Sequence, residues 1–158
     1  MAFRRSLCTA ASSFIARAAE AKDASALLGP FRSAGRFDAC LERAGMHCTS
    51  ISKEGVVCEL TVTNELANNY GTLHGGCIST LVDVVGTMAL LGVDPSRAGV
   101  SVEMNQSFCA AARIGDPIRA VGTVVRYGRT LGFSEVTVAN ASGKTVAIGR
   151  HTKFFPSS

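Results

Sequence analysis

The chain has little of several features that mark particular classes of protein. None of its 158 residues is Trp, only 4 are Pro, and 16 basic against 12 acidic residues give a net charge of +4. Nucleic-acid-binding domains concentrate Lys and Arg on one face or in one run, whereas the longest basic cluster here is Arg4-Arg5. We therefore expect no nucleic-acid partner. A few scattered basic residues better suit a small ligand that carries phosphates.

Metal-ligand and redox motifs are also absent. The 6 Cys residues stand at positions 8, 40, 48, 58, 77 and 109, and no two form a C-x-x-C pair. No apolar run reaches the ~20 residues of a membrane-spanning helix, and no long apolar signal segment precedes the cysteines. The sequence thus predicts reduced thiols inside a cell, no metal site, no cofactor and no membrane span. What is present, an apolar fraction of 47%, is typical of one folded domain with a core.

Residues 1–22 differ in composition from the rest of the chain. They contain three Arg and three Ser, and the first acidic residue is Glu20. An Arg-rich, Ser-rich and acid-poor segment is typical of a mitochondrial transit peptide. An ordinary surface helix or a ragged terminus is the alternative. We predict a targeting segment at 1–22, a folded domain at 23–158 and a mitochondrial location, with a cytoplasmic location as the alternative.

Hydrophobic periodicity predicts an α+β domain. Residues 37–45 form a short helical pattern that Gly45 ends, and 75–91 is the strongest helix candidate. Runs with alternating Val and Thr, separated by polar turns, predict strands. One long helix packed against a six-stranded antiparallel sheet is a two-layer arrangement. The six predicted strands cover 47–52, 56–63, 99–109, 117–128, 131–140 and 144–155.

The long predicted helix has two different faces. Apolar residues recur at the helical period in one stripe, which we expect to lie on the sheet. The other face is small and polar rather than strongly charged, so we expect a second subunit to cover it. The stripe consists of Ile78, Val82, Val85 and Ala89, and the other face of Gly76, Thr80, Asp83 and Thr87.

The start of this helix is a candidate site. A helix N-terminus presents free N–H groups, and Gly75-Gly76 lets an anion or oxyanion approach them closely. Asp83, two turns inside, is a candidate base or water-positioning group. Structural alternatives stay open at this point. In the structural alternative, Asp83 is a buried carboxylate with hydrogen-bond partners and His74 is a ring bonded to the backbone. The Gly pair then only forms a tight turn into the helix.

Several motifs together resemble one family. They are NNYGTLHGG, STLVDVVGTMALL, GVSVEMNQSF, GRTLGF and GRHTK, which span about residues 46–154. In this order they resemble the hotdog-fold acyl-CoA thioesterases, in the PaaI-like group that includes acyl-CoA thioesterase 13. HGG alone would be weak, but the whole set is specific. The resemblance implies a hotdog fold, in which a long central helix is wrapped by a six-stranded antiparallel sheet. It also implies homo-oligomers, commonly dimers of dimers, with active sites between subunits.

The same resemblance implies a role for each matching residue. Asn68 would orient the thioester carbonyl, the N–H of Gly75 would hold the oxyanion, and His74 would support the loop or the carbonyl. Asp83 of the partner subunit would activate or position the attacking water, or act as the nucleophile, and Ser101 would help to hold that water. The implied reaction converts acyl-CoA to free acid and coenzyme A, in fatty acid metabolism.

Coenzyme A would lie along two segments, 108–113 and 126–131. The alternative for each Arg in them is a solvated charge at a strand end. Cys77 and Cys109 lie near the predicted site, and we interpret both as spacers rather than nucleophiles. The substrate-binding residues implied by the resemblance are Phe108, Arg113, Arg126, Tyr127, Gly128, Arg129, Thr130 and Leu131, with Lys153 as a further candidate.

Two other functions fit less well. A non-catalytic acyl-CoA-binding hotdog protein would keep the basic loops and lose Asp83 or Asn68, and both are present. A hydratase of the same fold uses an Asp/His pair ahead of a different helix-start motif, which the sequence does not contain. We therefore predict an acyl-CoA thioester hydrolase.

Overall fold

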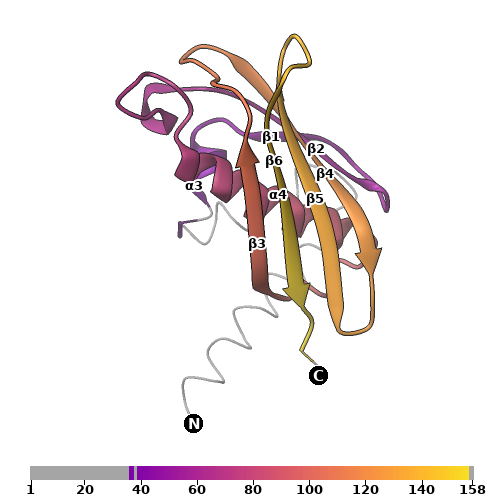
Figure 1. The fold of residues 1–158 in the computed structure, drawn as a ribbon. Coiled ribbons are helices and arrows are strands. Elements are labelled where there is room, and N and C mark those ends of the chain that lie inside the picture. Colours follow the sequence, from indigo (N-terminus) through magenta and orange to yellow (C-terminus); the bar gives the residue numbers. More distant parts are fainter. Residues whose placement is uncertain (1–35, 38, 157–158) are drawn as a thin grey trace.

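A six-stranded antiparallel sheet wraps around one long helix in the computed structural model, which describes residues 36–37 and 39–156 (Figure 1). The predicted targeting segment 1–22 lies outside the described residues. The α+β prediction is confirmed, and every predicted boundary lies within two residues of the observed one. The helices are α3 (Ala39–Arg43) and α4 (Gly75–Val93), with a 3-10 turn, η2 (Asn64–Leu66). The strands are β1 (His47–Ile51), β2 (Gly55–Thr61), β3 (Val100–Phe108), β4 (Pro117–Tyr127), β5 (Leu131–Asn140) and β6 (Thr145–Phe154).

The strand order is β1-β2-β4-β5-β6-β3, and all neighbours are antiparallel. The chain therefore does not add strands in sequence order. After α4 it places β3 at the far edge of the sheet beside β6, and then returns through β4 next to β2. This leaves β1 and β3 as the two edge strands.

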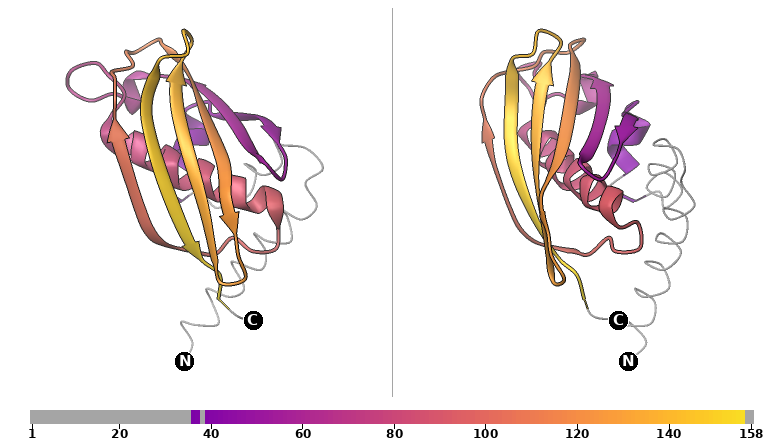
Figure 2. Two further views of the ribbon diagram at one scale, coloured as in Figure 1. Left: turned by 45° about the vertical axis from the view of Figure 1, so that its right-hand side comes forward. Right: turned by 90° about the vertical axis from the view of Figure 1, so that its right-hand side faces the viewer.

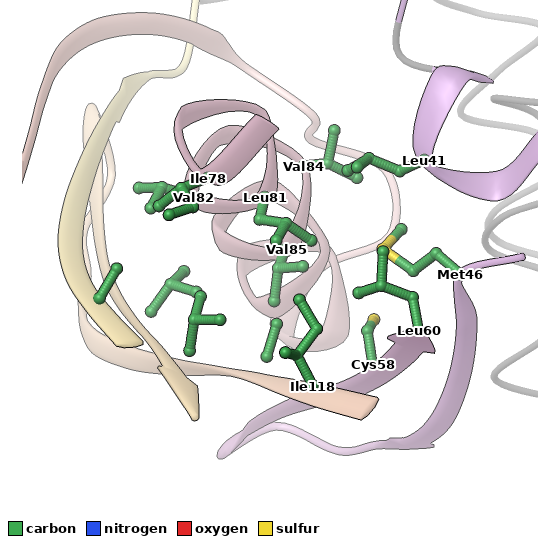
Figure 3. Packing of buried hydrophobic residues seen from close by; sticks show 14 of the residues in the cluster. Leu41, Met46, Cys58, Leu60, Ile78, Leu81, Val82, Val84, Val85 and Ile118 are labelled. Atoms are coloured by element: carbon green, nitrogen blue, oxygen red, sulfur yellow. The ribbon is translucent and has the colours of Figure 1, made fainter. Parts of the chain in front are cut away.

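The apolar stripe of α4 forms the centre of the core, as predicted. Ile78 is 4% exposed, and Val82, Val85 and Ala89 are fully buried. The sheet curves around α4 (Figure 2), and α3 covers the opposite side, where Val84 lies next to Leu41 (Figure 3). Burial of each such Val or Leu side chain contributes about 1.5–3 kcal/mol, which explains why a glycine-rich helix is stable here.

α4 is long and apolar enough to cross a membrane by length and composition, with a mean hydropathy of 1.8. The expectation that no segment reaches this length is therefore wrong. However, 67% of that window is buried inside the structure. The apolar length of α4 is explained by its position in the core, because the sheet covers one side of it and α3 packs on the other.

The polar face of α4 is covered differently from what the sequence predicts. Thr80 and Thr87 are only 9% and 6% exposed within a single chain. Thr87 accepts a hydrogen bond from Lys153 of β6. The chain's own strand thus covers the C-terminal part of this face, and no second subunit is required there. Gly76 and Asp83 remain accessible to solvent.

Candidate active site

Three polar side chains from three elements meet between α4, β3 and β6. Ser101 Oγ lies 2.8 Å from His151 Nε2 and 3.4 Å from Asp83 Oδ1. His151 Nε2 is itself 3.5 Å from Asp83 Oδ1. The structure therefore brings Asp83 and Ser101 together, as the resemblance implies, and adds His151 to them.

A β-bulge turns Ser101 toward this cluster. In the β3–β6 register Ser101 is opposite Lys153 and Met104 is opposite His151, with a register shift between Ser101 and Glu103. Side chains alternate between faces along a regular strand, so residues three apart point to opposite sides. The extra residue in β3 places both Ser101 and Met104 on the face of Lys153 and His151. Bulges often re-aim a side chain in this way beside an active site.

The imidazole ring of His151 lies against α4 at a glycine. A Cβ at Gly86 would lie 2.8 Å from Ser134 Oγ and 3.3 Å from His151 Nδ1, so a glycine here lets the helix approach both side chains closely. His151 is fully buried. Its burial lowers the pKa of the imidazole, and the nearby Asp83 carboxylate opposes that shift. His151 is therefore neutral at pH 7.

The hydrogen bonds of the cluster determine which atom donates each proton and which atom accepts it. Ser101 donates its hydroxyl hydrogen to Asp83 Oδ1. A hydroxyl has only one hydrogen, so His151 Nε2 carries the ring proton and donates it to Ser101 Oγ. His151 Nδ1 has no hydrogen-bond partner in the described part of the chain. His151 thus holds the Ser101 hydroxyl toward Asp83, whose side chain is 42% exposed and open to a water molecule.

A second group of predicted residues lies at the start of α4. His74 is the N-cap, and its Nδ1 accepts a hydrogen bond of 2.8 Å from the Gly76 N–H. The ring thereby supports the turn into the helix. Among the described residues, no hydrogen bond is found for the Gly75 N–H. The Phe108 ring would be 3.5 Å from a Cβ at Gly75 and forms a wall beside this amide.

Asn68 organises the loop before α4. Its Oδ1 accepts hydrogen bonds from the backbone of Tyr70 and Thr72, at 2.9 and 3.3 Å. Its Nδ2 donates to Thr72 Oγ1 at 3.0 Å. A side-chain amide has two N–H donors, so one is left for a substrate carbonyl. The predicted contact between Asn68 and a thioester stays a prediction.

These two groups are separated within one chain. Gly75 and Asp83 are eight residue steps apart in α4, which is about 12 Å along the helix axis. Reacting atoms must approach to about 3–3.5 Å. The oxyanion donor and the carboxylate of the same chain therefore do not serve one thioester together.

The predicted coenzyme A residues also lie at both ends of α4. Arg113 is beside the helix start, where it pairs with Thr72 in an isolated bridge. Residues 126–131 form the β4–β5 turn near the other end, where Arg97 donates a hydrogen bond to the carbonyl of Arg129. Arg97 also stacks on the Phe155 ring at 4.4 Å. One chain does not bring the two coenzyme A segments together.

Lys153 does not lie in a solvent-facing loop. It is 6% exposed, on the inner face of β6, and its Nζ donates to Thr87 Oγ1 at 2.9 Å. This placement directs the ammonium group toward α4 rather than toward the phosphates of coenzyme A. Cys77, in the first turn of α4, has its thiol pKa raised to about 11, chiefly by burial. A protonated thiol agrees with the interpretation of Cys77 as a spacer.

Comparisons with known proteins show the family of this chain. Residues 70–147 match the family model described as "Thioesterase superfamily". The chain is 41% identical over 118 residues to acyl-coenzyme A thioesterase 13 of Mus musculus. The aligned region covers 74% of this chain and 83% of that relative. The chain belongs to the thioesterase superfamily.

Solved structures of other thioesterases have the same fold. The thioesterase superfamily member 2 structure from Mus musculus matches with a TM-score of 0.75 and 37% identity, over 85% of this chain and 98% of that one. A thioesterase from Streptococcus pneumoniae, solved with coenzyme A, matches with a TM-score of 0.71 and 25% identity, over 80% and 98%. The predicted hotdog fold of this thioesterase is confirmed.

The sequence reasoning assigns no role to His151, although the GRHTK motif contains it. A usable signal was present in β6. Ala147 and Gly149 are small residues that face α4, and strict alternation puts His151 and Lys153 on the same inner face. Two polar residues at inward positions of a thioesterase strand indicate a site, because buried polar groups require partners.

Proposed function

We propose that this thioesterase hydrolyses acyl-CoA to a free acid and coenzyme A. The observation that carries the proposal is the pairing of Asp83 of α4 with Ser101 of β3, which His151 holds in place. The start of α4 in addition offers the Gly75 N–H. The substrate class is supported by the relative named acyl-coenzyme A thioesterase 13 and by the structural neighbour solved with coenzyme A.

The reaction is acyl transfer to water. The Asp83 carboxylate takes a proton from a water molecule that Ser101 helps to orient, and the water oxygen attacks the thioester carbon. The Gly75 N–H and the free Asn68 N–H stabilise the negative oxygen of the tetrahedral intermediate. Collapse of this intermediate breaks the C–S bond, and the proton held by Asp83 passes to the coenzyme A thiolate.

We further propose that two subunits share each active site. The edge strand β3 has unpaired backbone groups and exposed apolar side chains, among them Val100 and Phe108 at 54% and 58% exposure. Antiparallel pairing of β3 with its own copy would set the Phe108 end of one strand beside the Ser101 end of the other. Gly75 of one chain would then face Asp83 of the partner subunit.

The family resemblance also supports a larger assembly. We propose that two such dimers form a tetramer, in which Arg113 of one subunit and residues 126–131 of another line the path of coenzyme A. Arg126 and Arg129 would bring positive charge to its phosphates. A monomeric mass in native mass spectrometry would contradict both the shared site and the tetramer.

Thiol release from a panel of acyl-CoAs, followed with a thiol-reactive dye, tests the function. We expect release of coenzyme A at a rate proportional to enzyme concentration. The panel would cover short, long and aromatic acyl groups and would give the acyl preference. Tight acyl-CoA binding without release from any member would instead support a non-catalytic binding protein.

We also propose that residues 1–22 direct the protein to the mitochondrion, where it would act on fatty acyl-CoA. The support is their Arg-rich and acid-poor composition. A fluorescently tagged full chain is expected to colocalise with a mitochondrial marker, and a chain lacking residues 1–22 is expected to lose that location. An unchanged location after deletion would contradict the proposal.

A further inference from the structure

Lys153 is a buried basic residue that the proposed reaction does not use. Only 6% of the residue is exposed, and its Nζ donates to Thr87 Oγ1 at 2.9 Å. Burial of an ammonium group is costly, and Lys is almost never fully buried without a specific interaction. The chain thus keeps a positive charge inside the domain at a position where an apolar residue would pack.

Lys153 is next to the catalytic cluster both within the sheet and through its contact with α4. It follows His151 by two residues in β6, so both side chains point to the inner face, and it is directly opposite Ser101 in the β3–β6 register. Its partner Thr87 stands one helical turn after Asp83 in α4. Lys153 therefore lies alongside the group formed by Asp83, Ser101 and His151.

Every element packed around His151 contributes to its electrostatic surroundings. From α4 it faces the Asp83 carboxylate, and from β3 it faces the Ser101 hydroxyl. Glu103 of β3 is opposite Thr152 and accepts its hydroxyl hydrogen bond, so its charge acts on His151 from the other face of the sheet. From β5 His151 faces the neutral Ser134 hydroxyl, and its own strand supplies Lys153. Burial has the largest effect on the pKa of His151 and lowers it. Of the nearby charges, Asp83 raises this pKa, Lys153 lowers it and Glu103 raises it. Lys153 is thus the positive charge that counteracts the two carboxylates.

We propose that Lys153 is a positioning residue whose buried ammonium group adds to the burial of the His151 ring in keeping that ring neutral, so that the Asp83 carboxylate stays free for the attacking water. A protonated His151 would place a positive Nε2–H 3.5 Å from Asp83 Oδ1 and form an ion pair with it. That ion pair would occupy the carboxylate and release Ser101 from its present hydrogen bond. The neutral ring instead donates one N–H to Ser101 and leaves Asp83 available.

The first test is an NMR titration of the histidine rings in the substrate-free protein. The chain has only 3 His residues, so His151 can be assigned by comparison with His47 and His74 variants. In the wild type we expect His151 to be the neutral Nε2–H form at pH 7. In Lys153→Met, which keeps the length of the side chain and removes the charge, we expect the His151 midpoint to rise by about one pH unit. His47 and His74 should not move.

Two further variants separate charge from packing. Lys153→Gln is uncharged but can still donate to Thr87, and it should raise the His151 midpoint as Lys153→Met does. Arg150→Met removes a positive charge from the residue directly before His151 in the same strand, where the side chain is 69% exposed and bonded to Glu135. This control should leave the His151 midpoint unchanged.

The rate measurement, which alone rests on the proposed thioesterase activity, is the pH profile of kcat/KM. Removal of the Lys153 charge should move the acidic limb upward by about one pH unit and leave the rate near pH 8 within about threefold. A wild-type His151 that is protonated at pH 7, or an unchanged midpoint in the folded uncharged variants, would overturn the inference. A shifted midpoint without turnover of any acyl-CoA would uphold it and refute the proposed activity instead.

Discussion

Asp83→Asn is expected to lower kcat for acyl-CoA hydrolysis by about 100-fold to 10,000-fold, the range for loss of a positioned general base. Asn has the shape of Asp, and its Oδ1 can still accept the Ser101 hydrogen bond that Asp83 accepts at 3.4 Å. The cluster should therefore keep its geometry and lose only the group that takes the proton from water. KM should change little, because the substitution affects the transition state more than substrate binding.

The matched control is Asp94→Asn at the C-terminal end of α4. Asp94 is the C-cap and accepts hydrogen bonds from the backbone and hydroxyl of Ser96, so this substitution also replaces a carboxylate on the same helix. Its thiol-release rate should match that of the wild type. Wild-type-like turnover in a folded Asp83→Asn protein would remove Asp83 from the mechanism.

The features that were predictable from the sequence have local causes. Alternation of Val and Thr and the polar turns between the strands set the limits of β3 to β6, and Gly45, with a φ of +92°, ends α3 as expected. The stripe from Ile78 to Ala89 identified the buried side of α4 because a helix repeats every 3.6 residues. The motif NNYGTLHGG marked the start of α4 because this signal is also local: caps and glycines act on neighbouring residues.

The features that were not predictable depend on contacts between distant segments. Nothing near β3 in the sequence indicates that it joins the sheet beside β6, and only that pairing brings Ser101 to His151. The register shift before Glu103 is equally non-local, and strict alternation without it would misplace Ser101. The burial of Thr87 by Lys153 joins residues 66 positions apart, which explains why a second subunit seemed necessary to cover that face.

The second large effect is expected at the other end of the site, from Asn68→Asp. The new carboxylate keeps an oxygen that can accept hydrogen bonds from the Tyr70 and Thr72 amides, so the loop should stay folded. It loses both Nδ2 donors and places a negative charge where the oxyanion forms. Loss of an oxyanion donor lowers kcat by about 100-fold to 1000-fold, and the added charge should bring the effect to the upper end of that range.

A matched control distinguishes catalysis from loop structure. Thr72→Val removes the hydroxyl that accepts a hydrogen bond from Asn68 Nδ2 and donates one to Asn68 Oδ1, and leaves Asn68 with its donors. Each hydrogen bond contributes about 0.5–1.5 kcal/mol, and the backbone amides of Tyr70 and Thr72 still hold Asn68 Oδ1, so this variant should lose less than about tenfold in rate. Equal losses in Thr72→Val and Asn68→Asp would instead assign Asn68 a purely structural role.

Mixed oligomers of these two inactive variants test the shared active site most directly. Asp83→Asn and Asn68→Asp chains, with different affinity tags, would be coexpressed in equal amounts, and copurification through both tags would show that hybrids form. In the unselected mixture, random pairing makes about half of the dimers hybrids, and one of the two sites in each hybrid has both Asn68 and Asp83 intact. About one site in four is then intact, so we predict about one quarter of the wild-type rate. A mixture that contains hybrids but is no more active than the separate variants would contradict a site built from Asn68 and Gly75 of one chain and Asp83 of the partner subunit.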